Sequence, residues 1–181
     1  KVLICHERYE PDVGGGGEII IHNTAVHLQG LGVDVQVICA GDPAIESVDG
    51  IPTRRLPMSR YRFNLAAKQV TEMARSADLI QTYNYHACLP ALAAGRRTGK
   101  PVVCGIMGLF RDAWSSMRGP LLGPLFQAFE KYLLLRDYDQ LYFLSEYSRQ
   151  DGIHLGVDPA RSFVASPGVD GDRFRPAEVK Q

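Results

Sequence analysis

Residues 1–20 of the chain read KVLICHERYEPDVGGGGEII and combine three features. The run over residues 1–5 is apolar without alternation, which is typical of a β-strand that is covered on both faces. Four consecutive glycines follow at residues 14–17, and a stretch of helical length with an apolar stripe extends over residues 18–31. The opening of the chain therefore predicts a strand, a glycine loop and a helix, in that order.

The same alternation continues along the chain. Further apolar, β-branched runs are found at residues 33–39, 51–56, 78–82, 101–106, 140–144 and 162–165. Helical stretches lie between most of them, at residues 64–77, 86–97, 121–136 and 146–155. Strands that alternate with helices pair in parallel through right-handed crossovers. The pattern predicts an α/β fold, a doubly wound parallel sheet of about seven strands with helices on both faces, over residues 1–166.

Composition limits the classes of partner. The 181 residues contain 20 Lys and Arg against 20 Asp and Glu, and 45% are hydrophobic, as in a soluble globular domain. Zero formal charge removes the long-range attraction to nucleic acid, so no nucleic-acid partner is expected. No apolar run approaches the roughly 18–20 residues of a membrane span, and residues 1–5 lack a signal-peptide pattern, so we expect a cytoplasmic location.

Two groups of residues resemble metal ligands without supporting that role. Cys5, Cys39, Cys88 and Cys104 form no C-x-x-C pair and have no His at zinc spacing, so we expect buried free thiols. The D-x-D triplets, at residues 137–139 and 170–172, are interpreted as solvated turns between or after elements. No metal and no cofactor are expected.

The glycine loop is the strongest local signal for a ligand. The first amides of a helix lack partners and carry the positive end of the helix dipole, and glycine lets a phosphate approach them. Eight residues separate Cys5 from Gly14, and isoleucine occupies the third glycine position, so the dinucleotide fingerprint is not met. A ligand-free loop, and a NAD site with Asp42 on the ribose, stay open as alternatives.

Several stretches together resemble the amino-terminal domain of family 4 glycosyltransferases of GT-B architecture. They are YEPDVGGGGE (residues 9–18), LQGLGVDVQVICA (28–40), VDGIPTRRLP (48–57), ADLIQTYNYHACLPALAA (77–94), GKPVVCGIMG (99–108) and SEYSRQDGIHLGVDPARSFVASPGVDGDRFRP (145–176). The resemblance implies a Rossmann-like half of a GT-B enzyme. It makes residues 1–166 the acceptor-side domain and residues 167–181 an exit linker toward a carboxy-terminal nucleotide-sugar domain that this chain does not include.

The resemblance also implies an activity. A hexosyltransferase of this family moves a sugar from a nucleotide-sugar to an acceptor hydroxyl with retention, and the expected acceptor is a glycan or a lipid-linked acceptor. Without its own second domain the chain is expected to be inactive. Peripheral contact at the inner membrane face, through the apolar helix over residues 121–135, is an alternative to core packing, which we favour because Glu130 and Asp137 offset its cations.

Candidate site residues follow from the resemblance. Gly15, Gly16 and Gly17 match the loop that faces the donor diphosphate. Where relatives carry a histidine after the fourth strand, this chain has Tyr83, followed by Asn84 as a further acceptor contact. We take His86 as the catalytic, titratable contact, with capping of the next helix as its alternative.

The loop after the fifth strand departs from the family, because Met107 stands where many relatives have a histidine. Arg111 and Trp114 are then the acceptor contacts of that loop, the alternatives being a surface arginine and a core tryptophan. Ser145 either faces the cleft or only caps the last helix. Two other functions stay open, namely another GT-B activity such as a nucleotide-sugar epimerase, and a non-catalytic sugar- or nucleotide-binding module.

Overall fold

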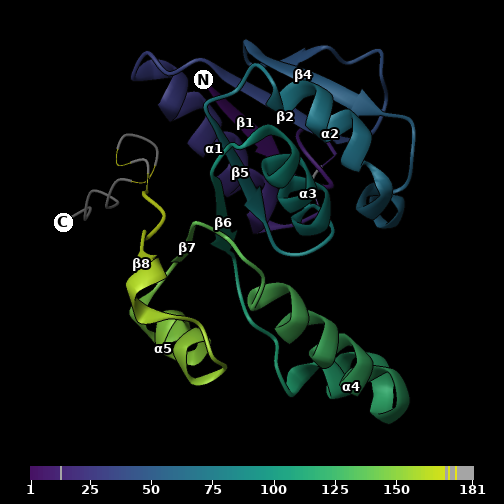
Figure 1. Cartoon of the computed structure of the whole chain (residues 1–181), viewed down its shortest axis with the longest axis vertical. Coiled ribbons are helices and arrows are strands. Elements are labelled where there is room, and N and C mark those ends of the chain that lie inside the picture. The colour runs from purple at the N-terminus through teal and green to yellow at the C-terminus, as the bar shows by residue number, and fades with distance from the viewer. Residues whose placement is uncertain (13, 170, 172–173, 175–181) are drawn as a thin grey trace, which may run out of the picture.

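A computed structural model describes residues 1–12, 14–169, 171 and 174 (Figure 1). Its sheet has the strand order β3-β4-β2-β1-β5-β6-β7-β8. The strands are β1 (Val2–Cys5), β2 (Val35–Ala40), β3 (Ser47–Val48), β4 (Ile51–Leu56), β5 (Leu79–Tyr83), β6 (Val102–Ile106), β7 (Gln140–Phe143) and β8 (Ser162–Val164). The helices are α1 (Gly16–Gly30), η1 (Arg60–Leu65), α2 (Ala67–Ala74), α3 (Cys88–Thr98), α4 (Ala113–Leu134), α5 (Glu146–His154) and η2 (Pro159–Arg161).

The predicted doubly wound parallel sheet is confirmed, and the structure adds one strand. Every pairing is parallel except that of β3 with β4. The added strand β3 is joined to β4 by Asp49 and Gly50, with φ of 47° and 78°. Two positive φ values are the requirement of a type I′ hairpin turn, for which Asp-Gly is a preferred pair. This two-residue strand only closes the edge of the sheet.

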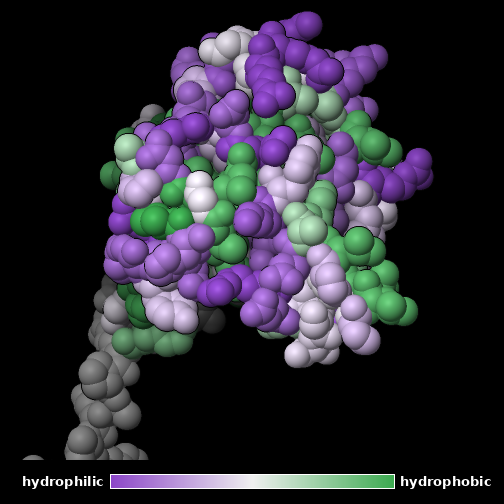
Figure 2. All heavy atoms as spheres, turned by 60° about the horizontal axis from the view of Figure 1, so that its bottom comes forward, coloured by the Kyte–Doolittle hydropathy of each residue, from purple (hydrophilic) through white to green (hydrophobic). Residues whose placement is uncertain are grey.

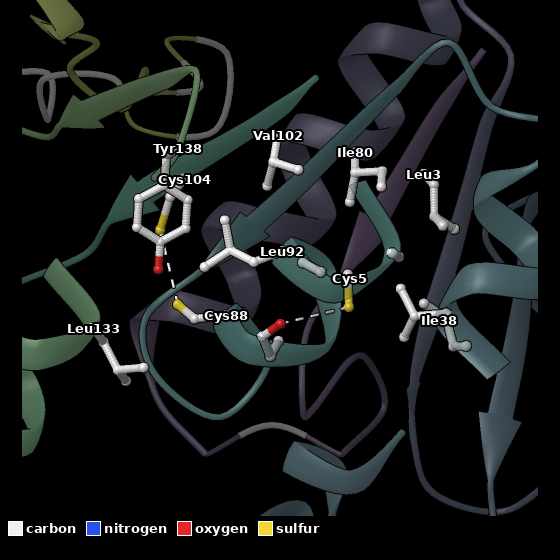
Figure 3. Packing of buried hydrophobic residues seen from close by; sticks show 14 of the residues in the cluster. Leu3, Cys5, Ile38, Ile80, Cys88, Leu92, Val102, Cys104, Leu133 and Tyr138 are labelled. Atoms are coloured by element: carbon white, nitrogen blue, oxygen red, sulfur yellow. Dashed lines mark hydrogen bonds between the residues drawn. The ribbon is translucent and has the colours of Figure 1, made fainter. Parts of the chain in front are cut away.

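Both faces of the sheet are covered, as the continuous apolar runs predict. Leu3 and Ile4 are neighbours in β1 and both are buried, yet they belong to different core clusters. On one face Leu3 shares its cluster with Leu92 of α3 (Figure 3), and on the other Ile4 shares its cluster with Ile21 of α1. The four cysteines are free and buried, which confirms that prediction.

Helix α4 differs from its prediction in both extent and burial. It begins at Ala113 rather than residue 121, and a break at Gly119 (φ 81°) divides it. The two parts fold back on each other, because Trp114 stacks on Phe126 with ring centroids 5.1 Å apart. The tip of this helical hairpin is apolar and open to solvent: Leu121 is 86% exposed. Core packing was therefore the wrong expectation for the first half of the predicted helix.

The other helical predictions need smaller changes. The stretch predicted as one helix over residues 64–77 is divided into η1 and α2. The last strand is followed by residues of the predicted exit linker, and residues 170, 172–173 and 175–181 of that linker lie outside the described part. Among the described helices, none is both long and apolar enough to cross a bilayer.

Candidate donor and acceptor site

The site is expected where parallel strands end, because ligands of open α/β sheets bind outside the carboxyl ends of the strands. The loops after β1, β2, β4, β5 and β6 all leave this edge. The chain that leaves β6 at this edge leads to α4 (Figure 1). Figure 2 turns the bottom of Figure 1 toward the viewer and shows a surface with both hydrophilic and hydrophobic side chains. The glycine loop and the loops that carry the other candidate residues therefore lie at the same edge of the sheet.

The glycine loop is open at this edge. Helix α1 begins at Gly16, and its N-cap, Gly15, supplies no side-chain cap. Gly14, Gly15 and Gly16 are exposed, and apart from its chain neighbours and its own helix backbone, no described atom lies within 4 Å of where a Cβ on Gly16 would stand. The first amides of α1 thus keep room for an anion, as a helix N-terminus provides. Glu18 is the acidic residue of this first turn.

A buried arginine fixes the loop that leads to the glycines. The Arg55 side chain at the end of β4 is fully buried and pairs with Asp12 at 3.2 Å between Nη1 and Oδ2. It also donates to the backbone oxygens of Glu10 and, at 3.5 Å, Tyr9. Arg55 therefore holds the loop from the buried side, a role that is not visible in the sequence.

We expect Arg55→Met to lower the free energy of unfolding by on the order of 3 kcal/mol, since it leaves three acceptors without their charged donor. Urea titration followed by circular dichroism measures the loss. Arg54→Met is the matched control, because Arg54 is exposed and forms only a surface pair with Glu72 at 3.2 Å, so its loss should stay below about 1 kcal/mol. Equal losses in the two variants would contradict the assignment.

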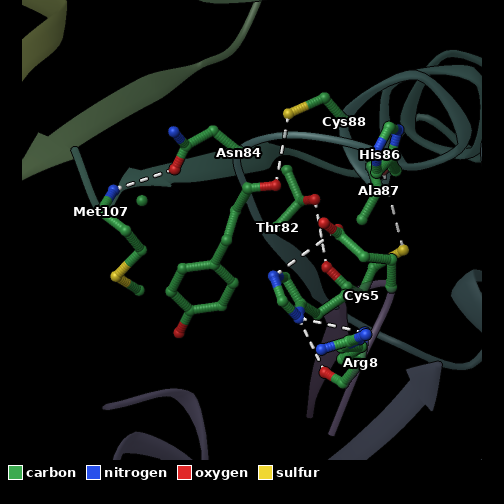
Figure 4. A network of polar contacts seen from close by, with 12 residues as sticks. Cys5, Arg8, Thr82, Asn84, His86, Ala87, Cys88 and Met107 are labelled. Atoms are coloured by element: carbon green, nitrogen blue, oxygen red, sulfur yellow. Dashed lines mark hydrogen bonds and ion pairs between the residues drawn. The ribbon is translucent and has the colours of Figure 1, made fainter. Parts of the chain in front are cut away.

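Asn84 joins the loops after β5 and β6. Its Oδ1 accepts from the backbone N–H of Met107 at 2.9 Å (Figure 4). Its Nδ2 donates to the carbonyl of Gly108 at 2.9 Å. Its amide is thus engaged in holding the two loops together. Met107, at the position where the family often has histidine, approaches the glycine loop with its Cγ 4.0 Å from the Cβ position of Gly17.

Tyr83 does not reach the surface. Its side chain is fully buried, and its hydroxyl and that of Tyr142 both accept from Nε2 of Gln81, at 2.7 and 3.0 Å. Burial, with a smaller contribution from Tyr142, raises the pKa of Tyr83 well above its usual range. The structure therefore gives Tyr83 a packing role in the core, in place of the acceptor contact that we predicted.

His86 is half-buried beside the site. Its Nδ1 accepts from Nδ2 of Asn64 at 2.9 Å, and the edge of the Tyr61 ring faces it at 5.3 Å between centroids. Helix α3 begins at Cys88 with Ala87 as N-cap, so His86 does not cap it. Burial lowers the pKa of His86, and the nearby carboxylate of Glu7 opposes that shift. A neutral ring with Nδ1 accepting keeps its proton on Nε2, free to donate.

The lowered pKa of His86 has a sign that can be tested. Because the folded state binds this proton less readily than the unfolded chain, with its ordinary value of 6.5, stability is full above pH 6.5 and decreases as the pH falls below it. We expect His86→Gln to reduce the loss of unfolding free energy between pH 7.5 and 5.5. Urea titrations at both pH values measure it, with His27→Gln on α1 as control; an unchanged pH dependence in His86→Gln would contradict the prediction.

The remaining predicted contacts have structural partners. Arg111 (φ 48°) donates from Nη1 to Asp151 at 2.8 Å, and its side chain is 43% exposed. Trp114 is 8% exposed and stacks on Phe126, so it is the core tryptophan of the alternative interpretation. Ser145 caps α5 by accepting from the N–H of Ser148 at 3.2 Å.

A buried carboxylate supports the Arg111 loop. Glu130 of α4 is 3% exposed and accepts from the backbone N–H groups of Phe110 at 3.0 Å and Arg111 at 2.8 Å, and from the Tyr85 hydroxyl at 2.6 Å. Our interpretation of Glu130 as a surface charge that offsets the cations of this helix is therefore wrong, because the hairpin of α4 turns it inward.

A pocket of about 500 Å³ lies beside the glycine loop. It is lined by Glu7, Arg8, Asp12, Ala40, Gly41, Met58, Ser59, Arg60 and Tyr61. The Arg8 guanidinium packs so closely on Gly14 that a Cβ there would collide with it. Glu7 and Arg8 were not predicted as site residues, although their position directly after the first strand was a usable signal. Within the described residues, no cluster of three or more His, Cys, Asp or Glu could hold a metal ion.

Fold and site define the class: a Rossmann-like α/β domain whose open helix N-terminus and pocket share the carboxyl edge of the sheet, as in one half of a GT-B enzyme. The chain belongs to Glycosyltransferase Family 4, whose model matches residues 14–173. A comparison with curated proteins gives no match.

Solved structures of low sequence identity share this fold. Anabaena HepE in complex with UDP-glucose superimposes with a TM-score of 0.71 at 16% identity, over 98% of this chain and 46% of HepE. Sucrose-phosphate synthase from Thermosynechococcus elongatus gives 0.70 at 15%, over 97% and 50%. UDP-N-acetylglucosamine 2-epimerase from Rickettsia bellii gives 0.59 at 16%, over 92% and 44%. The chain thus spans half or less of each of these proteins.

Proposed function

We propose that this chain is the acceptor-side domain of a retaining glycosyltransferase of the hexosyltransferase type. The complete enzyme would transfer a sugar from a nucleotide-sugar to an acceptor hydroxyl. The observation that carries the proposal is the open N-terminus of α1 at Gly15 and Gly16, placed at the same sheet edge as a pocket large enough for a sugar. The nucleotide-sugar domain would follow residues 167–181.

Catalysis in this proposal is electrostatic. The donor diphosphate gains negative charge as the sugar leaves, and preorganised amides at a helix N-terminus stabilise such charge without having to reorient. Gly15, Gly16 and Gly17 would provide these amides when the second domain closes on the loop. No metal or cofactor has a role in this scheme. His86 would donate from Nε2 to an oxygen of the bound sugars.

The acceptor would be a glycan or a lipid-linked glycan. The exposed tip of the α4 hairpin, with Leu121, Leu122 and Leu125, would make peripheral contact with the inner membrane face in the lipid-linked case. This contact would place the pocket near the membrane surface of a cytoplasmic enzyme.

The test uses the full-length protein together with the 181-residue chain. Each is incubated with a panel of nucleotide-sugars, and release of the nucleotide is measured with and without sugar acceptors. We expect turnover of at least one donor by the full-length protein and none by the 181-residue chain, which supplies one wall of the cleft. Donor binding without any turnover would instead favour a non-catalytic binding module.

A nucleotide-sugar epimerase is the second candidate. The sequence offered too few acids and histidines for this chemistry, but the fold brings His6 to 3.6 Å from the Glu7 carboxylate, and both influence the pKa of His86. An epimerase would convert the nucleotide-sugar without an acceptor and without releasing nucleotide. The same assay, with the sugar products separated by chromatography, therefore distinguishes the two activities.

A further inference from the structure

The pocket beside the glycine loop has two arginines on its lining that lack a carboxylate partner within the described part of the chain. The Arg60 guanidinium donates from Nη2 to the Tyr61 hydroxyl at 2.9 Å and lies 4.8 Å from the centre of that ring. The Arg8 guanidinium packs on Gly14 and forms none of the described ion pairs. By contrast, Asp12 in the same lining is already paired with Arg55.

The positive field of these arginines reaches the exposed Tyr61 side chain. The hydrogen bond from Arg60 lowers the pKa of the Tyr61 hydroxyl, and the charges of Arg60, Arg118 and Arg8 act in the same direction. Asp12 is neutralised by Arg55, so among the described lining residues the carboxylate of Glu7 is the remaining negative charge. This side of the pocket is therefore favourable for an anion.

Glu7 adds a second requirement for a ligand of this pocket, namely a hydrogen-bond donor. The residue is 8% exposed, and its Oε2 has no hydrogen-bond partner among the residues that the structure describes. The nearest imidazole nitrogen, Nε2 of His6, is 3.6 Å away, which is longer than a hydrogen bond. A buried carboxylate oxygen without a donor is costly unless a ligand supplies the donor. A hydroxyl group of a bound sugar would do so.

We propose that this pocket binds the acceptor, and that the acceptor is an anionic sugar whose hydroxyl donates to Glu7 while its carboxylate or phosphate binds Arg8 and Arg60. The proposal rests on the proposed function, because it names the acceptor class of the same transferase. A pocket of about 500 Å³ lies within the usual range for small ligands, roughly 300–1,000 Å³. A neutral sugar would satisfy Glu7 but would offer neither guanidinium group an anionic partner.

The experiment measures binding of single sugars to the full-length protein by calorimetry at low ionic strength. The probes are glucose, glucuronic acid, glucose 6-phosphate and inorganic phosphate. We expect at least one anionic sugar to bind about tenfold or more tightly than glucose, and more tightly than inorganic phosphate, because charged hydrogen bonds to arginine add to the hydroxyl contacts. The comparison of glucuronic acid with glucose 6-phosphate shows which anion is preferred. Equal binding of glucose and both anionic sugars, or no binding of any sugar, would overturn the proposal.

Variants separate the two requirements. Arg8→Gln and Arg60→Gln should remove the preference for the anionic sugar, so that its affinity ratio to glucose falls toward one, and Glu7→Ala should weaken glucose and anionic sugars alike. Arg97→Gln, an exposed arginine near the end of α3, is the matched control and should keep the preference. Thermal melting identifies any variant that fails to fold. A preference that survives both arginine changes would overturn the proposal.

The anionic preference of the pocket and the transferase activity are measured separately, so either proposal can fail while the other holds. Turnover of a nucleotide-sugar by the full-length protein tests sugar transfer, whereas the affinity ratio of anionic to neutral sugars tests only the pocket. Transfer to neutral acceptors with no anionic preference would contradict this inference and leave the transferase proposal intact. If Arg8→Gln weakened binding of the nucleotide-sugar instead of the anionic acceptor, Arg8 would belong to the donor site and its role here would be overturned.

Discussion

Gly16→Asp in the full-length protein should lower nucleotide-sugar affinity by about 100-fold, because like charges brought together at a binding site cost several kcal/mol. Gly16 is the first residue of α1, and apart from its chain neighbours and its own helix backbone, no described atom lies within 4 Å of its Cβ position, so the new side chain fits. Its carboxylate would occupy the space that the proposal gives to the diphosphate. Since an acid in the first helical turn is favourable by about 0.3–1 kcal/mol, the fold should be kept or stabilised.

The matched control for this prediction is Gly30→Asp, at the other end of the same helix. Gly30 is exposed and has equal space, but an acid at a helix C-terminus is slightly destabilising and lies far from the proposed diphosphate site. Calorimetry gives the donor affinities, and thermal melting gives the stabilities. Full donor affinity in a folded Gly16→Asp protein would remove the glycine loop from the proposed site.

Glu130→Leu has the largest expected effect on stability, a loss of about 4 kcal/mol in the free energy of unfolding. The carboxylate accepts from the backbone N–H groups of Phe110 and Arg111 and from the Tyr85 hydroxyl, in a partly buried setting. Each of the two backbone N–H groups left without an acceptor costs about 1–3 kcal/mol, whereas the Tyr85 hydroxyl keeps the Gly108 carbonyl at 3.3 Å. Such a loss is a large share of the roughly 5–15 kcal/mol that stabilise a domain.

Chemical denaturation measures this loss, and Glu72→Leu on α2 is its control. Glu72 forms only a surface ion pair with Arg54, so its removal should cost less than about 1 kcal/mol. We also expect amide hydrogen exchange at Phe110 and Arg111 to accelerate in Glu130→Leu, because both amides lose their acceptor. Protection that stays at the wild-type level would contradict the role of Glu130.

The fold could be predicted from the sequence because the patterns that indicate its strands and helices are local and repeat along the chain. Strands that are buried on both faces, such as β1 with Leu3 and Ile4, need apolar residues at successive positions, and this pattern distinguishes a parallel sheet from a half-exposed one. The first part of α4 was missed because Gly119 and Pro120 indicate a helix boundary, whereas the contacts that hold that part in place, such as the stacking of Trp114 on Phe126, are tertiary.

The glycine loop was located in the sequence for the same local reason. Glycines before a helix determine what can approach its first amides, whatever the rest of the chain does. The position of Glu7 directly after a strand was also visible. The missing hydrogen-bond partner of its carboxylate oxygen could not be predicted, because it depends on the groups from other elements that pack around Glu7.

The amino-acid sequence by itself determined the order of strands and helices, the parallel sheet and the exposed glycines before α1, because each of these depends on neighbours along the chain. The tertiary structure alone decided that Tyr83 lies in the core, that Glu130 faces inward and that Arg8 and Arg60 line one pocket with Glu7. Residues distant in the sequence make those contacts, and burial and charge pairing depend on all the groups that surround a side chain in space.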